Sequence, residues 1–145
     1  MKMNTLGTER LNLKLMHKDT GSQLYEQTCW GLWEVTIKQS NIFIGYIIVK
    51  PMDLFSELPD FSDIEIGWRL KQESWGSGYA TEAACAMFNE ITKQQDVKKI
   101  SATANKNNLA SIKVMEKLGM QFVKNYIQKE QGADVVSVHY SKSID

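Results

Sequence analysis

Leucines alternate with polar residues over positions 10–16, and this two-residue period predicts a strand with one buried face. Two segments rich in β-branched and aromatic residues follow at 32–38 and 42–50, and the polar residues 39–41 between them predict a hairpin. A short apolar run at 64–70 predicts a further strand. The first half of the chain is therefore expected to form much of a sheet.

Other segments have the apolar spacing of helices. Over 78–93 apolar residues recur every three or four positions, which predicts an amphipathic helix. A second helix is expected after Asn108, whose side chain suits an N-cap, and Gly119 suits the left-handed residue that ends a helix. A short helix is also predicted over 19–27, where an aspartate can cap its start.

Three more strands complete the pattern at 99–104, 121–128 and 134–141, with the last two forming a hairpin around Gly132. The resulting order is strand, helix, three strands, helix, strand, helix and two strands. This order predicts a mixed α/β fold in which a glycine turn lies about midway along a central sheet. With 145 residues and 43% apolar content, one domain over 1–145 is expected.

Composition narrows the classes of function. Seventeen basic and seventeen acidic residues cancel, which argues against a nucleic-acid-binding or anionic-membrane surface. Cys29 and Cys85 form no CxxC pair, which argues against a zinc site and fits a reducing compartment, and Cys85 is expected to be a buried small hydrophobe. There is no run of transmembrane length and no signal-peptide core, so a soluble cytoplasmic protein is expected.

The glycine turn between the strand at 64–70 and the helix at 78–93 is the strongest candidate binding site. Gly76 and Gly78 allow backbone angles closed to other residues and let a ligand approach the main chain. The first amides of the following helix lack partners within the helix, so a phosphate would suit this position. A tight strand-to-helix connection without a ligand is the alternative.

Two common glycine loops fit this turn poorly. A P-loop requires a lysine directly after its last glycine, where this chain has Tyr79. A dinucleotide loop requires an acidic residue about 20 positions further on, and residues 97–100 are not acidic. A dinucleotide-dependent oxidoreductase therefore stays only as a third alternative.

Three segments resemble the GNAT superfamily of N-acetyltransferases. The segment "WGSGYATEA" (75–83) resembles the cofactor loop Gln/Arg-x-x-Gly-x-Gly/Ala, although Trp75 stands where the wider superfamily has Gln or Arg. The segment "NNLASIKVMEKLGM" (107–120) resembles the second signature, in which an Asn precedes a Ser or Ala by three. The segment "TERLNLKL" (8–15) resembles the opening strand of the RimJ/RimL-like branch, the ribosomal-protein N-terminal acetyltransferases. The likeness implies a GNAT fold, with a central, mostly antiparallel mixed sheet of about seven strands flanked by helices.

The resemblance implies an enzyme that transfers the acetyl group of acetyl-CoA to a primary amine, without a metal or a covalent intermediate. Amides of the glycine turn would hold the pyrophosphate, and the strand end would pair with the pantetheine arm like an added strand. Asn108 would hydrogen-bond the same arm. The residues that the resemblance assigns to acetyl-CoA are Trp68, Arg69, Leu70, Trp75, Gly76, Ser77, Gly78, Tyr79, Ala80, Thr81, Asn108 and Ser111.

Acyl transfer to an ammonium requires a base for the amine and an acid for the thiolate. Glu65 is the candidate base, with Asp63 behind it, and the alternative for Glu65 is a solvent-facing strand carboxylate. Many relatives place a Tyr acid where this chain has Met115, which cannot donate. Ser111 is the candidate group near the sulfur, and its alternative is a hydroxyl that satisfies the helix backbone.

The remaining donors have weaker support. Tyr126 and Tyr140 are fallback acids, whereas His17 and His139 lie away from these segments in the sequence and are each expected to be a structural or surface histidine. The four tryptophans are expected to be core or pocket walls.

The acceptor is the least determined part. The stretch 24–32 is short where the branch usually has a pair of helices, so an open acceptor groove is expected, or one completed by residues 52–61 or by a second subunit in a homodimer. A protein N-terminus, a lysine and a small amine all remain candidate acceptors. A catalytically weak acyl-CoA-binding or sensing module with the same fold is the alternative function.

Overall fold

The computed structural model describes residues 5–16, 30–52, 57–58 and 60–144, and every element below lies within these ranges. The elements in chain order are β1 (Thr5–Gly7), β2 (Leu11–Leu15), β3 (Gly31–Ile37), β4 (Phe43–Met52), β5 (Asp60–Leu70), a 3-10 turn η1 (Gln72–Ser74), α2 (Tyr79–Ile91), β6 (Lys99–Asn105), α3 (Leu109–Lys117), β7 (Gln121–Glu130) and β8 (Ala133–Ser143). The helix predicted over 19–27 lies outside the described residues.

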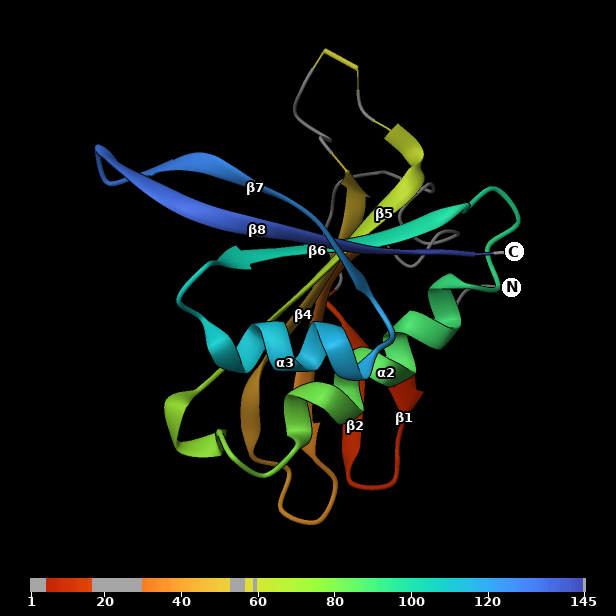
Figure 1. Ribbon diagram of the computed structural model, residues 1–145. Helices are drawn as coiled ribbons and strands as arrows, with labels where there is room; N and C mark the ends of the chain where they lie inside the picture. The colour runs from red at the N-terminus through yellow and green to blue at the C-terminus, as the bar shows by residue number, and fades with distance from the viewer. Residues whose placement is uncertain (1–4, 17–29, 53–56, 59, 145) are drawn as a thin grey trace.

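The strands of the described residues form one open sheet in the order β1-β2-β3-β4-β5-β6-β8-β7 (Figure 1). Neighbouring strands are antiparallel except for β5 and β6, which run parallel. The predicted mixed α/β fold with a mostly antiparallel sheet is confirmed. The sheet has eight strands rather than about seven, because the three residues of β1 are too few to show a hydrophobic period.

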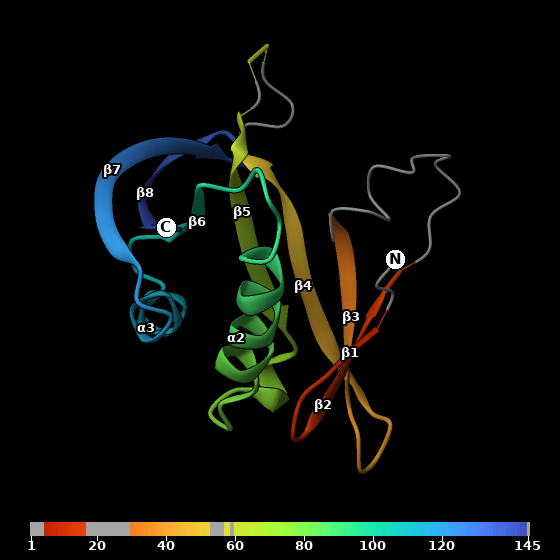
Figure 2. The same ribbon diagram turned by 90° about the vertical axis from the view of Figure 1, so that its right-hand side faces the viewer.

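The core lies between α2 and one face of β2 to β5. Leu11, Trp33, Ile47, Ile66 and Met87 are fully or almost fully buried in it, and burial of each such side chain contributes about 1.5–3 kcal/mol. Figure 2 shows α2 against this face, while α3 lies to one side beneath the curved strands β7 and β8. The helix that follows the glycine turn is therefore anchored by its apolar side.

Several predicted boundaries need correction. β4 continues to Met52, which pairs with Asp60 beyond a register irregularity, so β5 begins four residues before the apolar run at 64–70. Polar residues open this strand, and they carry no period from which its start could be predicted. Cys85 is exposed rather than buried, because it lies on the side of α2 opposite Ala84 and Met87.

The predicted capping residues of α3 and the predicted turn at Gly132 are confirmed, whereas α2 ends at Ile91 rather than at residue 93. The Asn108 side chain accepts a hydrogen bond from the Ser111 amide and caps α3. Gly119 has φ +84°, and the amide of the next residue bonds back to the Met115 carbonyl, as expected for a left-handed helix end. Gln131 and Gly132 both have positive φ at the turn between β7 and β8, as a two-residue hairpin turn requires.

The start of α2 is tied to the β1–β2 turn by Glu82. Its carboxylate accepts hydrogen bonds from the Thr8 hydroxyl (2.5 Å), the Arg10 amide (2.8 Å) and the Arg10 Nε (2.7 Å). The Arg10 guanidinium also lies over the Tyr79 ring at 4.5 Å. Partial burial raises the pKa of Glu82, but these hydrogen bonds outweigh burial and hold its pKa below the usual range. The network fixes where the helix begins relative to the sheet.

Glu82→Gln should lower stability at neutral pH by about 1 kcal/mol, or about 2–4 °C in Tm, because the network loses its anion. A depressed folded-state pKa contributes stability above the ordinary glutamate pKa, and that contribution is lost as the pH falls through the folded value. The Tm difference from wild type should therefore be largest near pH 7 and shrink toward pH 3. Glu9→Gln, in the same turn with an exposed side chain, is the control, and an equal Tm difference at both pH values would contradict the assignment.

Candidate active site

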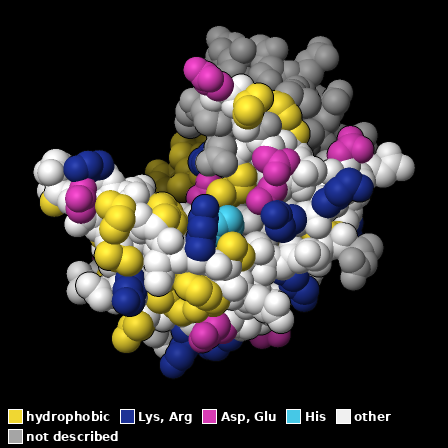
Figure 3. All heavy atoms as spheres, turned by 45° about the horizontal axis from the view of Figure 1, so that its top comes forward, with side chains coloured by type: hydrophobic (Ala, Val, Ile, Leu, Met, Phe, Trp, Pro, Cys, Tyr) yellow, Lys and Arg dark blue, Asp and Glu magenta, His cyan; other side chains and the backbone are white. Residues whose placement is uncertain are grey.

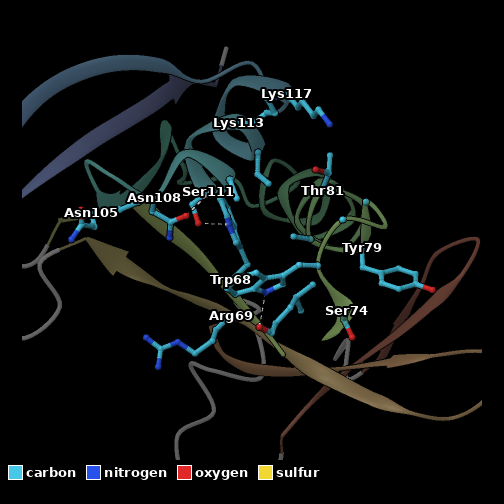
Figure 4. Close-up of a pocket in the computed structure, with 18 of the residues that line it drawn as sticks. Trp68, Arg69, Ser74, Tyr79, Thr81, Asn105, Asn108, Ser111, Lys113 and Lys117 are labelled. Carbon is cyan, nitrogen blue, oxygen red and sulfur yellow. Dashed lines mark hydrogen bonds between the residues drawn. The ribbon is translucent and has the colours of Figure 1, made fainter. Parts of the chain in front are cut away.

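The main feature of the sheet is a fork between its two parallel strands. β5 and β6 pair only at Asp63–Lys99, Ile64–Ile100 and Glu65–Ser101, and beyond Glu65 they diverge. A cleft of about 730 Å³ fills the opening, lined by the ends of β5 and β6, the glycine turn, the starts of α2 and α3, and part of β7 (Figure 4). All the residues predicted to contact acetyl-CoA line this cleft except Ser77.

The glycine turn at one end of the cleft has the geometry of an anion site. Gly76 and Gly78 have φ of +86° and +81°, values that side-chain-bearing residues rarely adopt. Gly78 is the N-cap of α2 and supplies no side-chain acceptor, and the first bond inside the helix runs from the Glu82 amide to the Gly78 carbonyl. The preceding amides, together with the positive end of the helix dipole, can therefore receive phosphate oxygens.

Trp75 holds this turn against the strand before it. Its indole Nε1 donates to the Leu70 carbonyl at 2.9 Å, although the residue is 63% exposed. This bond gives Trp75 a structural task that needs an indole N–H, at a position where the wider superfamily has Gln or Arg.

The strand edge facing the fork offers alternate residues to a ligand. The Lys71 amide donates to the Ile44 carbonyl on β4, so the main-chain groups of odd-numbered residues here, Arg69 included, face β4. The main-chain groups of Trp68 and Leu70 consequently face the cleft. An extended arm can pair with Trp68 and with the Leu70 amide, because the Leu70 carbonyl already accepts from the Trp75 indole. Arg69 can contribute to the cleft only through its side chain.

Trp68, Asn108 and Ser111 meet across the cleft. The Trp68 Nε1 donates to the Ser111 hydroxyl at 3.3 Å, and the Asn108 side chain accepts from the Ser111 amide at 3.1 Å (Figure 4). Since the serine oxygen accepts the indole proton, its own O–H is directed elsewhere and can donate. The serine therefore combines a local contact with the capacity to act as a donor in the cleft.

Glu65 occupies the apex of the fork. It is in the last residue pair before the strands diverge, and it alternates with the core residues Ile64 and Ile66, so its side chain lies on the face of the sheet away from the core. Lys50 Nζ lies 2.7 Å from its Oε1, and the Thr103 hydroxyl lies 3.3 Å from its Oε2. Glu65 is not among the cleft-lining residues, but Thr103 is.

Asp63 lies one step deeper on the same face and has a different environment. Its side chain is buried, accepts a hydrogen bond from Ser101 at 2.7 Å and lies 3.7 Å from Lys99 Nζ. Burial raises the pKa of Asp63, although the bond from Ser101 and the Lys99 charge oppose this. Its pairing with buried Ser101 gives it a structural role behind Glu65.

The structure also adds residues that the sequence interpretation did not include. The cleft receives Thr103, Asn105, Lys113, Lys117 and a pair of β7 residues, Gln128 and Glu130. Lys113 and Lys117 are four positions apart on α3, a spacing that places both on one helix face and could have been noticed in the sequence. The β7 residues could not, because β7 reaches the cleft only by curving over α3 (Figure 2).

Other predicted donors lie elsewhere. Met115 is buried in the core, and Tyr140 packs edge-on against Phe122. Neither these residues nor Tyr126 line the cleft. His139 was expected to be a structural or surface residue. On β8 it is the cross-strand partner of Thr103 on β6, and Thr103 contacts Glu65.

The described part of the chain contains neither a group of metal-binding side chains nor a helix that could span a membrane. No three of its histidine, cysteine, aspartate and glutamate side chains are grouped so that they could hold a metal ion. None of its helices combines the length and apolar character needed to cross a membrane.

Known proteins share this sequence pattern. The family model for the acetyltransferase (GNAT) domain matches residues 7–121. Two relatives from Bacillus subtilis strain 168 are the protein YkkB, 32% identical over 94 residues, and the uncharacterized N-acetyltransferase YnaD, 33% identical over 98 residues. These alignments cover 65% and 66% of this chain but 52% and 54% of the relatives. The chain thus matches about half the length of each relative.

Solved structures share the fold over nearly the whole chain. A GNAT-family acetyltransferase from Bacillus anthracis superposes with a TM-score of 0.76 at 21% identity, covering 96% of this chain and 98% of that one. RimL, a ribosomal L7/L12 α-N-protein acetyltransferase solved with coenzyme A, gives 0.75 at 14% identity, covering 97% and 98%. The ribosomal-protein-S5-alanine acetyltransferase of Vibrio fischeri gives 0.78 at 17% identity, with 97% of both chains covered.

Gly78→Val should weaken coenzyme A binding by about tenfold to a hundredfold, because a branched side chain at φ +81° displaces the amides that would meet the pyrophosphate. Isothermal titration calorimetry measures the change. Gly132→Val is the control, since Gly132 has a similar φ of +83° and open space around it. Unchanged affinity in a folded Gly78→Val protein would remove the glycine turn from the binding site.

Proposed function

The chain belongs to the GNAT family of acetyltransferases, and on that premise we propose that it transfers the acetyl group of acetyl-CoA to a primary amine by direct attack. The observation that carries the proposal is the fork itself. One cleft joins a helix N-terminus suited to phosphate and a strand edge suited to an extended arm, and its lining residue Thr103 contacts the Glu65 carboxylate at the apex of the fork.

Each part of the cleft then has a binding task. Amides from Gly76 to Thr81 would hold the pyrophosphate, and the main-chain groups of Trp68 and the amide of Leu70 would pair with the pantetheine arm. Lys113 and Lys117 add positive charge beside the phosphate region. The thioester would thereby be directed toward the apex of the fork.

Glu65 would act as the base, directly or through a water. The Lys50 ammonium and the Thr103 hydroxyl both contact its carboxylate and orient its oxygens. The proton of the acceptor ammonium passes to Glu65, the freed nitrogen attacks the thioester carbon, and the carbon–sulfur bond breaks as the amide forms. The Trp68 amide faces the cleft and is placed to stabilise the oxyanion.

Ser111 would assist departure of the sulfur. Its hydroxyl accepts from Trp68, so its own proton can be given to the leaving thiolate, and the second proton lost by the attacking nitrogen restores the hydroxyl. This assignment replaces the tyrosine used by many relatives, since Met115 lies in the core.

The proposal also names a branch of the family and a class of amine acceptor. Structural similarity to RimL and to the S5-alanine acetyltransferase supports the RimJ/RimL-like branch, and on that basis we place a protein N-terminal amine first among the acceptors, ahead of lysine and small amines. The acceptor groove would be open or completed by a second subunit. The segment 52–61 is also predicted to complete it, and its residues 53–56 and 59 lie outside the described residues. We expect the reaction to take place in the cytoplasm.

A thiol-release assay with acetyl-CoA and a panel of amines tests the function. We expect free coenzyme A to appear with at least one amine class, and Ser111→Ala to lower kcat by about tenfold or more with little change in KM for acetyl-CoA. Binding of coenzyme A without turnover across N-terminal peptides, lysine peptides and small amines would instead support the weak acyl-CoA-binding module.

Glu65→Gln should lower kcat by about 100-fold or more while leaving coenzyme A affinity near wild type, because Glu65 lies outside the cleft lining. The exposed Glu116 on α3 supplies the matched control, Glu116→Gln, which should leave kcat unchanged. A Tm measurement checks that loss of the Lys50 pair has not unfolded the protein. Wild-type turnover in the Glu65 variant would exclude this residue as the base.

A further inference from the structure

His139 carries an unusual atom on the face of the sheet that holds Glu65. Within the part of the chain that the structure describes, its Nε2 is the only buried side-chain nitrogen or oxygen without a hydrogen-bond partner. Buried polar atoms are almost always paired, and an exception calls for a functional or structural reason. The acyl-transfer steps described above do not use this imidazole.

Strand register places His139 next to the proton chemistry. His139 on β8 is the cross-strand partner of Thr103 on β6, and the Thr103 hydroxyl contacts the Glu65 carboxylate. Direct cross-strand partners project to the same face of a sheet. One strand therefore separates the imidazole from the carboxylate, with Thr103 between them.

The charged groups around His139 come from every neighbouring strand. Asp63 and Glu65 lie on β5, Lys99 on β6 and Lys124 on β7, and Lys50 on β4 pairs with Glu65. The space-filling view shows histidine between basic and acidic side chains on this face (Figure 3). Charges of both signs thus surround one half-buried imidazole.

These surroundings set the protonation state of His139. Burial lowers the pKa of the imidazole, Lys124 and Lys99 lower it further, and the Asp63 and Glu65 carboxylates act in the opposite direction but do not prevail. His139 is consequently neutral at neutral pH and able to accept a proton.

Resting on the proposed acetyl transfer, we propose that His139 accepts the proton that Glu65 has taken from the acceptor ammonium. It acts only through Glu65 and does not touch the reacting atoms, so it is a positioning residue. Each turnover converts an ammonium and a thioester into an amide and a thiol, so one proton must leave. Glu65 takes this proton from the ammonium and must lose it again before the next cycle. His139 receives it through the intervening Thr103 hydroxyl or a water, and releases it to solvent as the neutral imidazole reforms.

The pH dependence of kcat distinguishes this relay from a structural role. His139→Gln should lower kcat at pH 8 by about tenfold and move the acid limb to lower pH, because a carboxylate titrates below an imidazole. KM for acetyl-CoA should stay unchanged, and added imidazole should restore part of the activity of His139→Ala. Ser141→Ala, two residues along the same face of β8, is the control. A folded His139→Gln protein with the wild-type kcat and pH profile would overturn the proposal.

A second measurement does not depend on turnover. The chain has two histidines, so the His139 imidazole signal can be assigned in an NMR titration by its loss in His139→Gln. Glu65→Gln should lower the His139 pKa, because the Glu65 charge raises it. An unchanged His139 pKa would refute the coupling even in an active enzyme. A shifted pKa in a protein that acetylates no amine would confirm the coupling and place the failure in the proposed function.

Discussion

The short parallel pairing of β5 and β6 is the constraint on which the rest of the structure depends. Three residue pairs hold the strands together, and then the strands separate. Separation leaves the main-chain groups of Trp68 and the amide of Leu70 facing an opening instead of a neighbouring strand, while the Leu70 carbonyl is bonded to the Trp75 indole. Backbone groups without partners are costly when buried, so this edge favours a ligand that can take the place of a strand.

The two faces of the sheet at the fork have different chemistry. The cleft contains the helix N-terminus, two lysines and the Ser111 hydroxyl, all suited to an anionic thioester ligand. The face away from the core contains Glu65, Asp63, Thr103 and His139, which are suited to holding and moving protons. Thr103, which lines the cleft and contacts Glu65, is where the two sets meet. The lysines of the two sets are also different. Lys113 and Lys117 lie in the cleft, whereas Lys50 and Lys99 pair with the carboxylates of Glu65 and Asp63.

Positioning of the glycine turn depends on contacts from distant parts of the chain. The Trp75 indole bonds to the end of β5, and Glu82 in the first turn of α2 receives three hydrogen bonds from the β1–β2 turn. Between these two anchors the flexible glycines can be held in one conformation. Pre-organised amides bind an anion better, because less conformational entropy is lost on binding.

Local sequence patterns determined the order of most strands, both described helices, the Asn108 cap and the glycine turn, because periodicity and backbone permissiveness are properties of neighbouring residues. They could not determine the short strand β1 or the polar start of β5, where no period exists. Only the tertiary structure decided that His139 lies beside Thr103, that β7 reaches the cleft, and that Lys50 pairs with Glu65. Each of these contacts depends on which strands become neighbours and in which register, and strand order and register are set by the packing of the whole sheet.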